Sequence, residues 1–485
     1  MSDYLYGTYG HLGETVAQNA DTADTVVVAI GMAPVNLVAG YKTAGIINKP
    51  VKLQNLSDAQ RTMGYSSDWS KFTLCETMAA HFDNAEGNIG PVYVINVLNP
   101  EVHKTATKTT EAITFTNGRG SIKSDIIILD SLVLEDKVEG TDYTKSYDFS
   151  NGKVIIASLD TEDPITGSIS ASYDTIDISA VTATTIAGTQ ADGVYTGIQA
   201  IKLLYSTYNV ITNLIVAPGW SDKPDVYKAI AKVRQQINGH WDAIGLTDLP
   251  ISATTILAAK TFKTEDAYSD EGCKSFWPQA VDASGKIFHL SSLAAVEFMR
   301  ADAAHDGVPM ETCGNKSIPV VKQYFGALAT NQGFDQLEAK ELAKNGIATC
   351  VFWGGNWVLW GDSTDAYTFG AEAQDARNTF DTSMRMMYYI TNSFQKEWGN
   401  IIDKPFTKQL KDTIINREQE KLDGLVAVGA LIGHPSVSFI EDKNPLTSIK
   451  NGDFRWDIPV TPVVPLKSAS VYVAYTDAGF SAYFE

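Results

Sequence analysis

Histidines that lie close to serines or acids are the residues of this sequence most able to catalyse a reaction. His289 opens the segment HLSSLAAVEFM, with Ser291 two residues further on; His434 precedes a proline and a serine, and His305 lies within DAAHD. Such sets could supply a Ser–His–Asp triad, in which an imidazole accepts the proton of a nucleophilic hydroxyl. None of the histidines lies in the Gly-x-Ser-x-Gly turn that exposes such a serine. We therefore expect no catalytic residue.

A glycine-rich segment and four scattered cysteines are the other candidates for a chemical site. The segment WGGNWVLWG at 353–361 is not followed by a Lys-Ser/Thr pair, which a phosphate-binding loop requires. We interpret it as an aromatic hairpin or a strand edge. The cysteines have no CxxC spacing, and no HExxH, EF-hand or GxGxxG pattern occurs. The sequence predicts no cofactor-binding and no metal-binding residue.

The secondary-structure elements that would have to position catalytic or ligand-binding side chains alternate between buried strands and amphipathic helices. TVVVAIGMAP (25–34) and PVYVINVL (91–98) are apolar runs typical of buried strands, and the helical pattern of 71–84 lies between them. After residue 193 the alternation resumes, with a helix expected over 195–208 and a strand over 213–220. Strands that alternate with helices predict a mostly parallel, covered sheet.

The middle and the end of the chain follow other patterns. From about residue 101 to 192 short alternating stretches dominate, which predicts a β domain inserted into the α/β domain. Two long helices are expected over 378–398 and 405–431, and proline-interrupted strands over 454–475. Three lysines around the start of the second helix are spaced i, i+4 and i+7 and would share one helical face: Lys404, Lys408 and Lys411. This face is either simply solvated or a basic stripe for an acidic partner.

Both ends of the chain contain potential strands with few charges. Ser468–Thr476 carries no charge and alternates Val471, Val473 and Tyr475 on one side with Tyr472 and Ala474 on the other. It is either the last strand of its own sheet or a strand donated to a neighbouring subunit. In the mostly polar first 25 residues, a potential strand would place Tyr4 and Tyr6 on one side and Leu5 on the other.

The acidic composition restricts the partners. The formal net charge is −19 and the pI is about 4.8, so phosphate backbones repel the chain and direct nucleic-acid binding is not expected. No apolar run approaches the roughly 18 residues that span a bilayer, and direct membrane contact is not expected. The opening MSDYLYGTYGHLGE lacks the pattern of a signal peptide, so we expect folding in a cytoplasm.

Several passages, in a consistent order, resemble the tail sheath family of contractile phage tails. NLIVAPGW is similar to a strand followed by Ala-Pro-Gly in that family, here at 217–219. The passage GIATCVFWGGNWVLWGDST resembles a family segment through Trp360, Gly361 and Thr364, and DIPVTPVVPLKSASVYVAY resembles the proline-spaced closing strand. Two places depart from the family pattern: Gly7–Gly10 at the start and Lys467 near the end.

The resemblance implies an α/β multidomain fold with a mostly parallel sheet core, an inserted all-β domain, an α+β C-terminal domain and extended terminal arms. The expected segments are an N-terminal arm 1–25, a subtilisin-like sheath domain 26–100 plus 193–360, the inserted domain 101–192, a domain 361–465 near the tube, and an arm strand 466–485. The arms would pair between subunits through Tyr4, Leu5, Tyr6, Val471, Tyr472, Val473 and Tyr475. Lys404, Lys408 and Lys411 would face the tube.

In function, the resemblance implies a structural subunit that polymerises around a tail tube and contracts to drive the tube through the host envelope. Its partners would be copies of itself, the tail tube protein, and the baseplate and tail terminator proteins, with no cofactor. The subunit would be part of the virion tail and would assemble in the host cytoplasm. An α/β hydrolase and a non-contractile tube or capsid component remain the alternatives.

Overall fold

The computed structural model describes residues 21–327, 329–372 and 375–483. The chain divides into two compact units, which we call the N-terminal unit (to Phe406) and the C-terminal unit (from Thr407). The candidate arm residues Tyr4, Leu5 and Tyr6 lie outside the described residues. No helix in the described ranges combines the length and the apolar character needed to cross a membrane.

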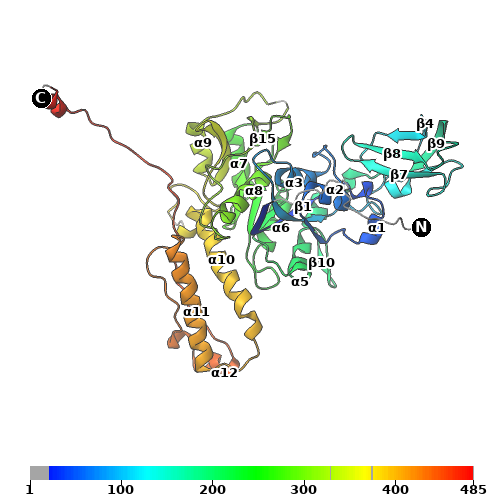
Figure 1. Ribbon diagram of the computed structural model, residues 1–485. Helices are drawn as coiled ribbons and strands as arrows, with labels where there is room; N and C mark the ends of the chain where they lie inside the picture. The colour runs from blue at the N-terminus through cyan, green and yellow to red at the C-terminus, as the bar shows by residue number, and fades with distance from the viewer. Residues whose placement is uncertain (1–20, 328, 373–374, 484–485) are drawn as a thin grey trace, which may run out of the picture. The chain divides into compact units, whose positions relative to one another are not determined.

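The N-terminal unit is built around one eight-stranded sheet (Figure 1). The six strands from β18 to β3 run parallel, and the two edge strands are antiparallel to their neighbours. In spatial order the strands are β19 (Asn356–Trp360), β18 (Ile347–Trp353), β14 (Cys273–Phe276), β13 (Ile244–Asp248), β12 (Leu214–Val216), β1 (Asp21–Gly31), β3 (Ile89–Asn96) and β2 (Pro50–Leu53). The mixed α/β fold expected from the sequence is confirmed.

Helices and small sheets surround this sheet. Helix α8 contacts β1, β13 and helix α3. Most of its residues are buried, as is typical of a helix enclosed in a core. The other helices of this unit are α1 (Tyr41–Ala44), α2 (Leu56–Met63), α3 (Thr73–Phe82), α4 (Ala183–Ala187), α5 (Leu204–Tyr208), α6 (Pro224–Val233), α7 (Ile256–Glu265), α8 (Leu290–Ala303), α9 (Gln336–Ala343) and α10 (Asp381–Trp398). Small sheets pair β10 (Gln190–Ala191) with β11 (Val194–Tyr195), and β15 (Gln279–Val281) with β16 (Ile287–Phe288) and β17 (Lys322–Tyr324).

The segment between β3 and α4 forms two three-stranded sheets with a core of their own. These strands are β4 (Thr109–Phe115), β9 (Gly167–Tyr173) and β6 (Val133–Leu134), and β5 (Arg119–Ile122), β8 (Lys153–Ser158) and β7 (Tyr143–Asp148). Ile176, Val181 and Ile186 already belong to the core of the large sheet. Helix α4, which the sequence pattern did not indicate, begins at a capping box formed by Thr182 and Thr185.

The prediction of one amphipathic helix over 195–208 is wrong for the first half of this segment. Gly197 has φ +53°, and a Cβ there would lie 2.3 Å from the carbonyl oxygen of Ile186. A regular α-helix does not continue through a residue with this backbone conformation. A 3₁₀ helix spans Gly197–Leu203 instead, and regular α-helix is confined to α5.

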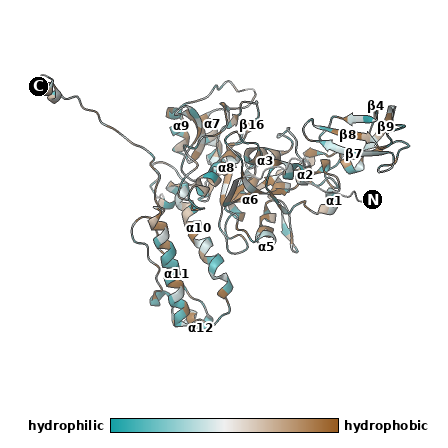
Figure 2. Ribbon diagram, viewed as in Figure 1, coloured by the Kyte–Doolittle hydropathy of each residue, from teal (hydrophilic) through white to brown (hydrophobic). Residues whose placement is uncertain are grey.

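The C-terminal unit contains the long helix α11 (Lys408–Ala427) and the short helix α12 (Leu446–Asn451). Leu431 and Pro462, and Ser438 and Asp457, form isolated antiparallel bridges. No strand forms within 454–475 of the described chain, contrary to the sequence-based expectation. The prolines of this stretch lack the N–H that a ladder needs. In Figure 2, helix α11 carries both hydrophilic and hydrophobic residues, whereas the centre of the N-terminal unit is mostly hydrophobic.

Candidate assembly surfaces

His289, the strongest catalytic candidate in the sequence, is held at the start of α8 by two polar neighbours. Its Nδ1 lies 2.8 Å from Glu76 Oε2, and its Nε2 lies 2.7 Å from the side-chain amide of Gln279. Burial disfavours the charged imidazole, but the adjacent Glu76 carboxylate outweighs it and raises the pKa of His289 to about 9. A protonated imidazole in this position cannot act as a general base near neutral pH.

The nearby serine does not complete a triad. Ser291 Oγ donates a hydrogen bond to Asp248 Oδ2 at 2.5 Å, and the backbone N–H of Ser291 donates to Oδ1 of the same carboxyl at 3.1 Å. Burial raises the pKa of Asp248 to about 6. Ser291 is fully buried. A nucleophile needs a hydrogen bond to its base and access to substrate, and Ser291 lacks that access.

The glycine-rich segment forms the hairpin of β18 and β19. Gly354 and Gly355 have φ +62° and +94°, which suits a tight two-residue turn between antiparallel strands. Phe352 and Trp353, just before the turn, are 59% and 51% exposed. The interpretation as an aromatic hairpin is confirmed.

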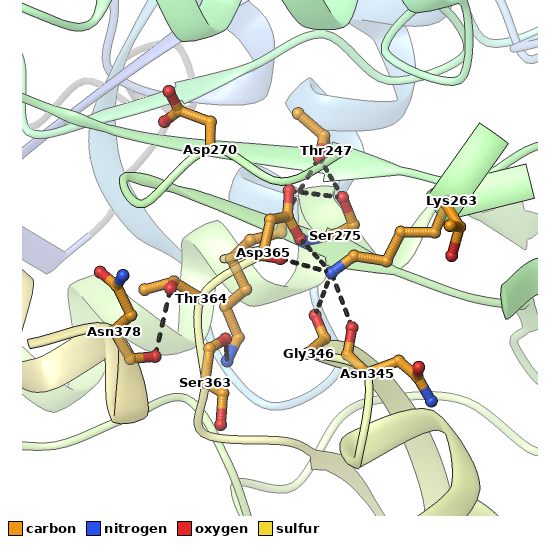
Figure 3. Close-up of polar contacts among 12 residues, drawn as sticks. Thr247, Lys263, Asp270, Ser275, Asn345, Gly346, Ser363, Thr364, Asp365 and Asn378 are labelled. Carbon is orange, nitrogen blue, oxygen red and sulfur yellow. Dashed lines mark hydrogen bonds and ion pairs between the residues drawn. The ribbon is translucent and has the colours of Figure 1, made fainter. Parts of the chain in front are cut away.

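A buried polar network holds the chain that follows this hairpin (Figure 3). Lys263 Nζ donates to the carbonyl oxygens of Asn345 at 2.7 Å and Asp365 at 2.8 Å, and lies 3.6 Å from the Asp365 carboxylate. That carboxylate also accepts hydrogen bonds from the backbone N–H and the hydroxyl of Ser275, both at 2.8 Å. The segment after β19 is thereby tied to α7 and β14.

A second buried pair fixes the start of α10. Lys274 Nζ, on β14, lies 2.6 Å from Asp381 Oδ2, and both side chains are almost completely buried. The same ammonium donates to the carbonyl oxygen of Gly361 at 2.9 Å, and Thr312 donates to Asp381 at 2.9 Å. Since each charge has a close opposite charge and further hydrogen bonds, the pair can exist in the interior.

The candidate arm residues at the C-terminus are almost fully exposed. Val471, Tyr472, Val473 and Tyr475 have exposed fractions of 85%, 93%, 90% and 85%. Residues 468–476 belong to no helix or strand, and in the described chain their backbone forms no hydrogen bond with another backbone group. Figure 1 draws them as an open segment that ends in a short helical turn. Apolar side chains in such a segment need a partner surface.

Both edges of the large sheet are already occupied by other parts of the N-terminal unit. Beside β19, the N–H of Asn315 donates to the Leu359 carbonyl at 2.7 Å, and the N–H of Ile318 donates to the Trp357 carbonyl at 2.9 Å. Beside β2, the hydroxyl of Tyr208 lies 3.3 Å from both the Lys52 nitrogen and the Pro50 carbonyl oxygen. These contacts obstruct the addition of a strand to this sheet.

The three lysines do not share one helical face, so that part of the prediction is wrong. Helix α11 begins at Lys408, because Thr407 caps it by accepting a hydrogen bond from the Leu410 N–H at 3.1 Å. Lys404 lies in the preceding turn, directly before Pro405, where helical backbone is disfavoured.

The two lysines that remain on α11 lie in its first two turns. The Lys408 residue is exposed, and Lys411 Nζ lies 3.4 Å from Asp412 and 5.7 Å from the centre of the Phe439 ring. No acidic residue is present in the first turn of the helix. Cations at this end oppose the helix dipole, so the arrangement does not serve helix stability.

No family profile matches the chain, but individual tail proteins do. The tail sheath protein of Burkholderia phage BcepMu is 26% identical over 491 residues, which cover 96% of this chain and 95% of that protein. The major tail sheath protein of Serratia phage KSP20 is 24% identical over 62% of this chain and 72% of its own length. The chain is a homologue of tail sheath proteins. The resemblance noted in the sequence is confirmed.

Solved structures share the fold. A chain of the anti-feeding prophage baseplate superposes with a TM-score of 0.58 at 12% identity and covers 98% of this chain and 100% of its own. A chain of the PVC sheath complex, an extracellular contractile injection system in the contracted state, gives a TM-score of 0.56 at 12% identity, with 99% of both chains covered. The large sheet, the small sheets and the helices match sheath protein folds.

Four buried charged residues of the N-terminal unit were not among the residues predicted from the sequence. Lys263, Lys274, Asp365 and Asp381 hold the passage that carries Trp360, Gly361 and Thr364; the Thr364 hydroxyl donates to the Asn378 carbonyl at 3.2 Å. Lys274 lies in a strand that is completely buried, β14 (CKSF), but two of the four residues of this strand are polar and its burial is evident only from the structure. A buried lysine predicts a buried acid, but the sequence alone does not indicate which one.

Proposed function

We propose that this chain is the structural subunit of a contractile tail sheath, which polymerises around a tail tube and contracts to drive the tube through the host envelope. The observation that carries the proposal is homology to a tail sheath protein over 96% of the chain. The exposed, uncharged C-terminal segment supports it, because a polymer subunit needs surface that only assembly covers.

The C-terminal arm, 466–485, links subunits by donating the segment 468–476 as a strand to a neighbouring copy. About six paired residues of this segment would form about five backbone hydrogen bonds, each contributing roughly 0.5–1.5 kcal/mol net. The N-terminal arm acts in the same way through Tyr4, Leu5 and Tyr6. It is shorter than the expected 1–25, because β1 already pairs with β3 from Asp21 onward. Since such contacts do not close on themselves, they generate a helical array.

The segments between the arms divide into an α/β sheath domain, an inserted β domain and a C-terminal domain near the tube. Two bounds differ from the expected ones. The core of the inserted domain ends at Tyr173 and not near residue 192, and residues 361–406 belong to the N-terminal unit and not to a domain of 361–465. Contraction is a change of packing between rigid subunits, with the arms as hinges. The stored energy resides in the extended lattice, so the subunit needs neither an active site nor a cofactor. The baseplate starts assembly and the tail terminator ends it. The protein is part of the virion tail and assembles in the host cytoplasm.

The tube-facing contact is made by the basic start of α11. Lys408 and Lys411 present positive charge at the helix end that also carries the positive pole of the dipole. Lys404 adds charge from the turn before the helix. An acidic tube surface fits this end, and the attraction steers assembly more than it adds affinity.

Electron microscopy of the purified protein, alone and mixed with tail tubes, tests this function. We expect sheath-like polymers whose length and diameter differ between an extended and a contracted form. The matched variant lacks Ser468–Glu485 and should remain a folded monomer, because both units keep their cores. Normal sheath polymers from this truncated protein would refute linkage by the C-terminal arm. A polymer of one fixed length and diameter would refute contraction.

A further inference from the structure

The C-terminal arm does not end with its strand segment. Beyond residue 476 the chain forms a 3₁₀ helix, Ala478–Ala482, in which the Phe480 N–H donates to the Asp477 carbonyl at 2.9 Å and the Tyr483 N–H donates to the Phe480 carbonyl at 3.1 Å. The Ala478 N–H also donates to the Thr476 hydroxyl at 3.2 Å, which fixes how the turn leaves the arm. This ordered turn is built onto a segment that forms no helix or strand of its own.

The turn exposes two aromatic side chains. Phe480 is 60% exposed and Tyr483 is 78% exposed. Residues three apart superimpose along a 3₁₀ helix, so both rings lie on one side of the turn. Ala478, Gly479 and Ala482 are small, which leaves the two rings as its dominant feature. Aromatic rings on a small, rigid backbone are typical of the anchors that fill pockets in protein interfaces.

The strand segment before the turn defines its own register only weakly, since only the difference in size between Tyr472 and Ala474, and between Val473 and Tyr475, opposes a slip of two residues. Valine occurs at 471 and again at 473, so a slip of two residues puts the same side chain on the same face of the sheet. Side-chain alternation prevents slips by one residue but not by two. No charge within 468–476 opposes such a slip. A donated strand of this composition needs a fixed point outside itself.

We propose that Phe480 and Tyr483 form a terminal aromatic anchor that docks on the same neighbouring copy that receives the strand and thereby fixes the register of that strand. The proposal rests on the proposed function, in which 468–476 pairs with a second copy. Only Asp477, Ala478 and Gly479 separate the strand segment from Phe480, so the Cα atom of Phe480 must lie within about 15 Å of the end of that segment. A copy that receives the strand is therefore always within reach of the anchor.

Three variants separate the anchor from the strand. The first replaces both rings, Phe480→Ala with Tyr483→Ala; the second lacks Asp477–Glu485 but keeps the strand; the third lacks Ser468–Glu485. The control is Phe369→Ala, which removes a ring of similar exposure (68%) from the N-terminal unit. The critical concentration for polymerisation is measured by sedimentation, and the regularity of the polymer by electron microscopy.

We expect the first two variants to raise the critical concentration at least tenfold and to give irregular polymers, the third not to polymerise, and the control to match the wild type. If the first two variants polymerise normally while the third does not, the anchor is refuted and strand donation stands. Normal polymers from the third variant refute both.

Cross-linking identifies what the anchor binds. The full-length chain is prepared with p-benzoylphenylalanine in place of Phe480, and isotopically heavy and light copies are mixed before polymerisation and illumination. Cross-linked peptides that join a heavy to a light copy are the expected result. Cross-links found only within one copy, or only to the tail tube protein, would overturn the proposal.

Discussion

Replacing Lys274 by methionine should destabilise the N-terminal unit strongly, because the substitution leaves Asp381 buried without its counter-charge. The two groups are 2.6 Å apart, and their side chains are 0% and 1% exposed. Removing one partner of a buried pair costs about 3–5 kcal/mol of unfolding free energy. The reciprocal variant, Asp381→Leu, leaves the ammonium with only the carbonyl oxygens of Gly361 and Ser363, and should cost a similar amount.

The double variant, Lys274→Met with Asp381→Leu, gives the sharper test. It removes both charges and loses three hydrogen bonds, at roughly 1 kcal/mol each: two from the ammonium to carbonyl groups and one from the Thr312 hydroxyl to Asp381. We therefore expect it to be about 2–3 kcal/mol less stable than the wild type, and more stable than either single variant.

Urea unfolding followed by tryptophan fluorescence measures these differences. The control is Arg61→Met, which breaks an exposed pair with Asp58 and should leave the unfolding midpoint unchanged. The reasoning would be refuted if the single variants cost less than about 1 kcal/mol, or if the double variant cost the sum of the two singles.

Three further perturbations have defined outcomes. The pKa of His289 is raised from 6.5 to about 9, so the stabilising contribution of this residue is fully present below pH 6.5 and is lost as the pH rises through 9. His289→Gln should remove about 3 kcal/mol of this pH dependence. Equal unfolding curves of the wild type at pH 6.5 and 9.5 would contradict this expectation. Gly361→Ala should cost about 2–3 kcal/mol in thermal or urea unfolding, because φ is +133° and the new Cβ would lie 2.9 Å from the Ala348 Cα; wild-type stability would be the contrary result. The double variant Lys408→Glu with Lys411→Glu should preserve self-assembly and helix stability but weaken assembly on tubes, measured by co-sedimentation. Lys404→Glu, which lies outside the helix, should have a smaller effect. Unaltered tube binding of the double variant would exclude the basic contact.

Strands β1, β3 and β12 of the large sheet could be predicted because their apolar runs are buried on both faces, whereas the sequence pattern did not indicate β2 and β14. The run TVVVAIG, for example, contains four completely buried residues in a row, from Val27 to Ile30. Errors arose where one backbone position outweighed a side-chain pattern. Gly197 takes a left-handed conformation that no helical period indicates, and Pro405 keeps Lys404 out of α11.

The buried polar contacts could not be predicted, because they join residues that are far apart in sequence. Lys263 and Asp365 are separated by 102 positions, and Lys274 and Asp381 by 107. Composition can show that a buried lysine needs a partner, but the choice of partner depends on the folded chain. For the segment 468–476, the alternation of side chains between two faces was evident from the sequence. That no strand in the described part of its own unit pairs with it emerged only from the structure.

The most direct test of the account is a high-resolution cryo-electron microscopy map of the assembled polymer, traced through the C-terminus. We predict that residues 468–476 run as a strand hydrogen-bonded to a neighbouring copy. A map in which these residues fold back and pair within their own subunit would contradict the account.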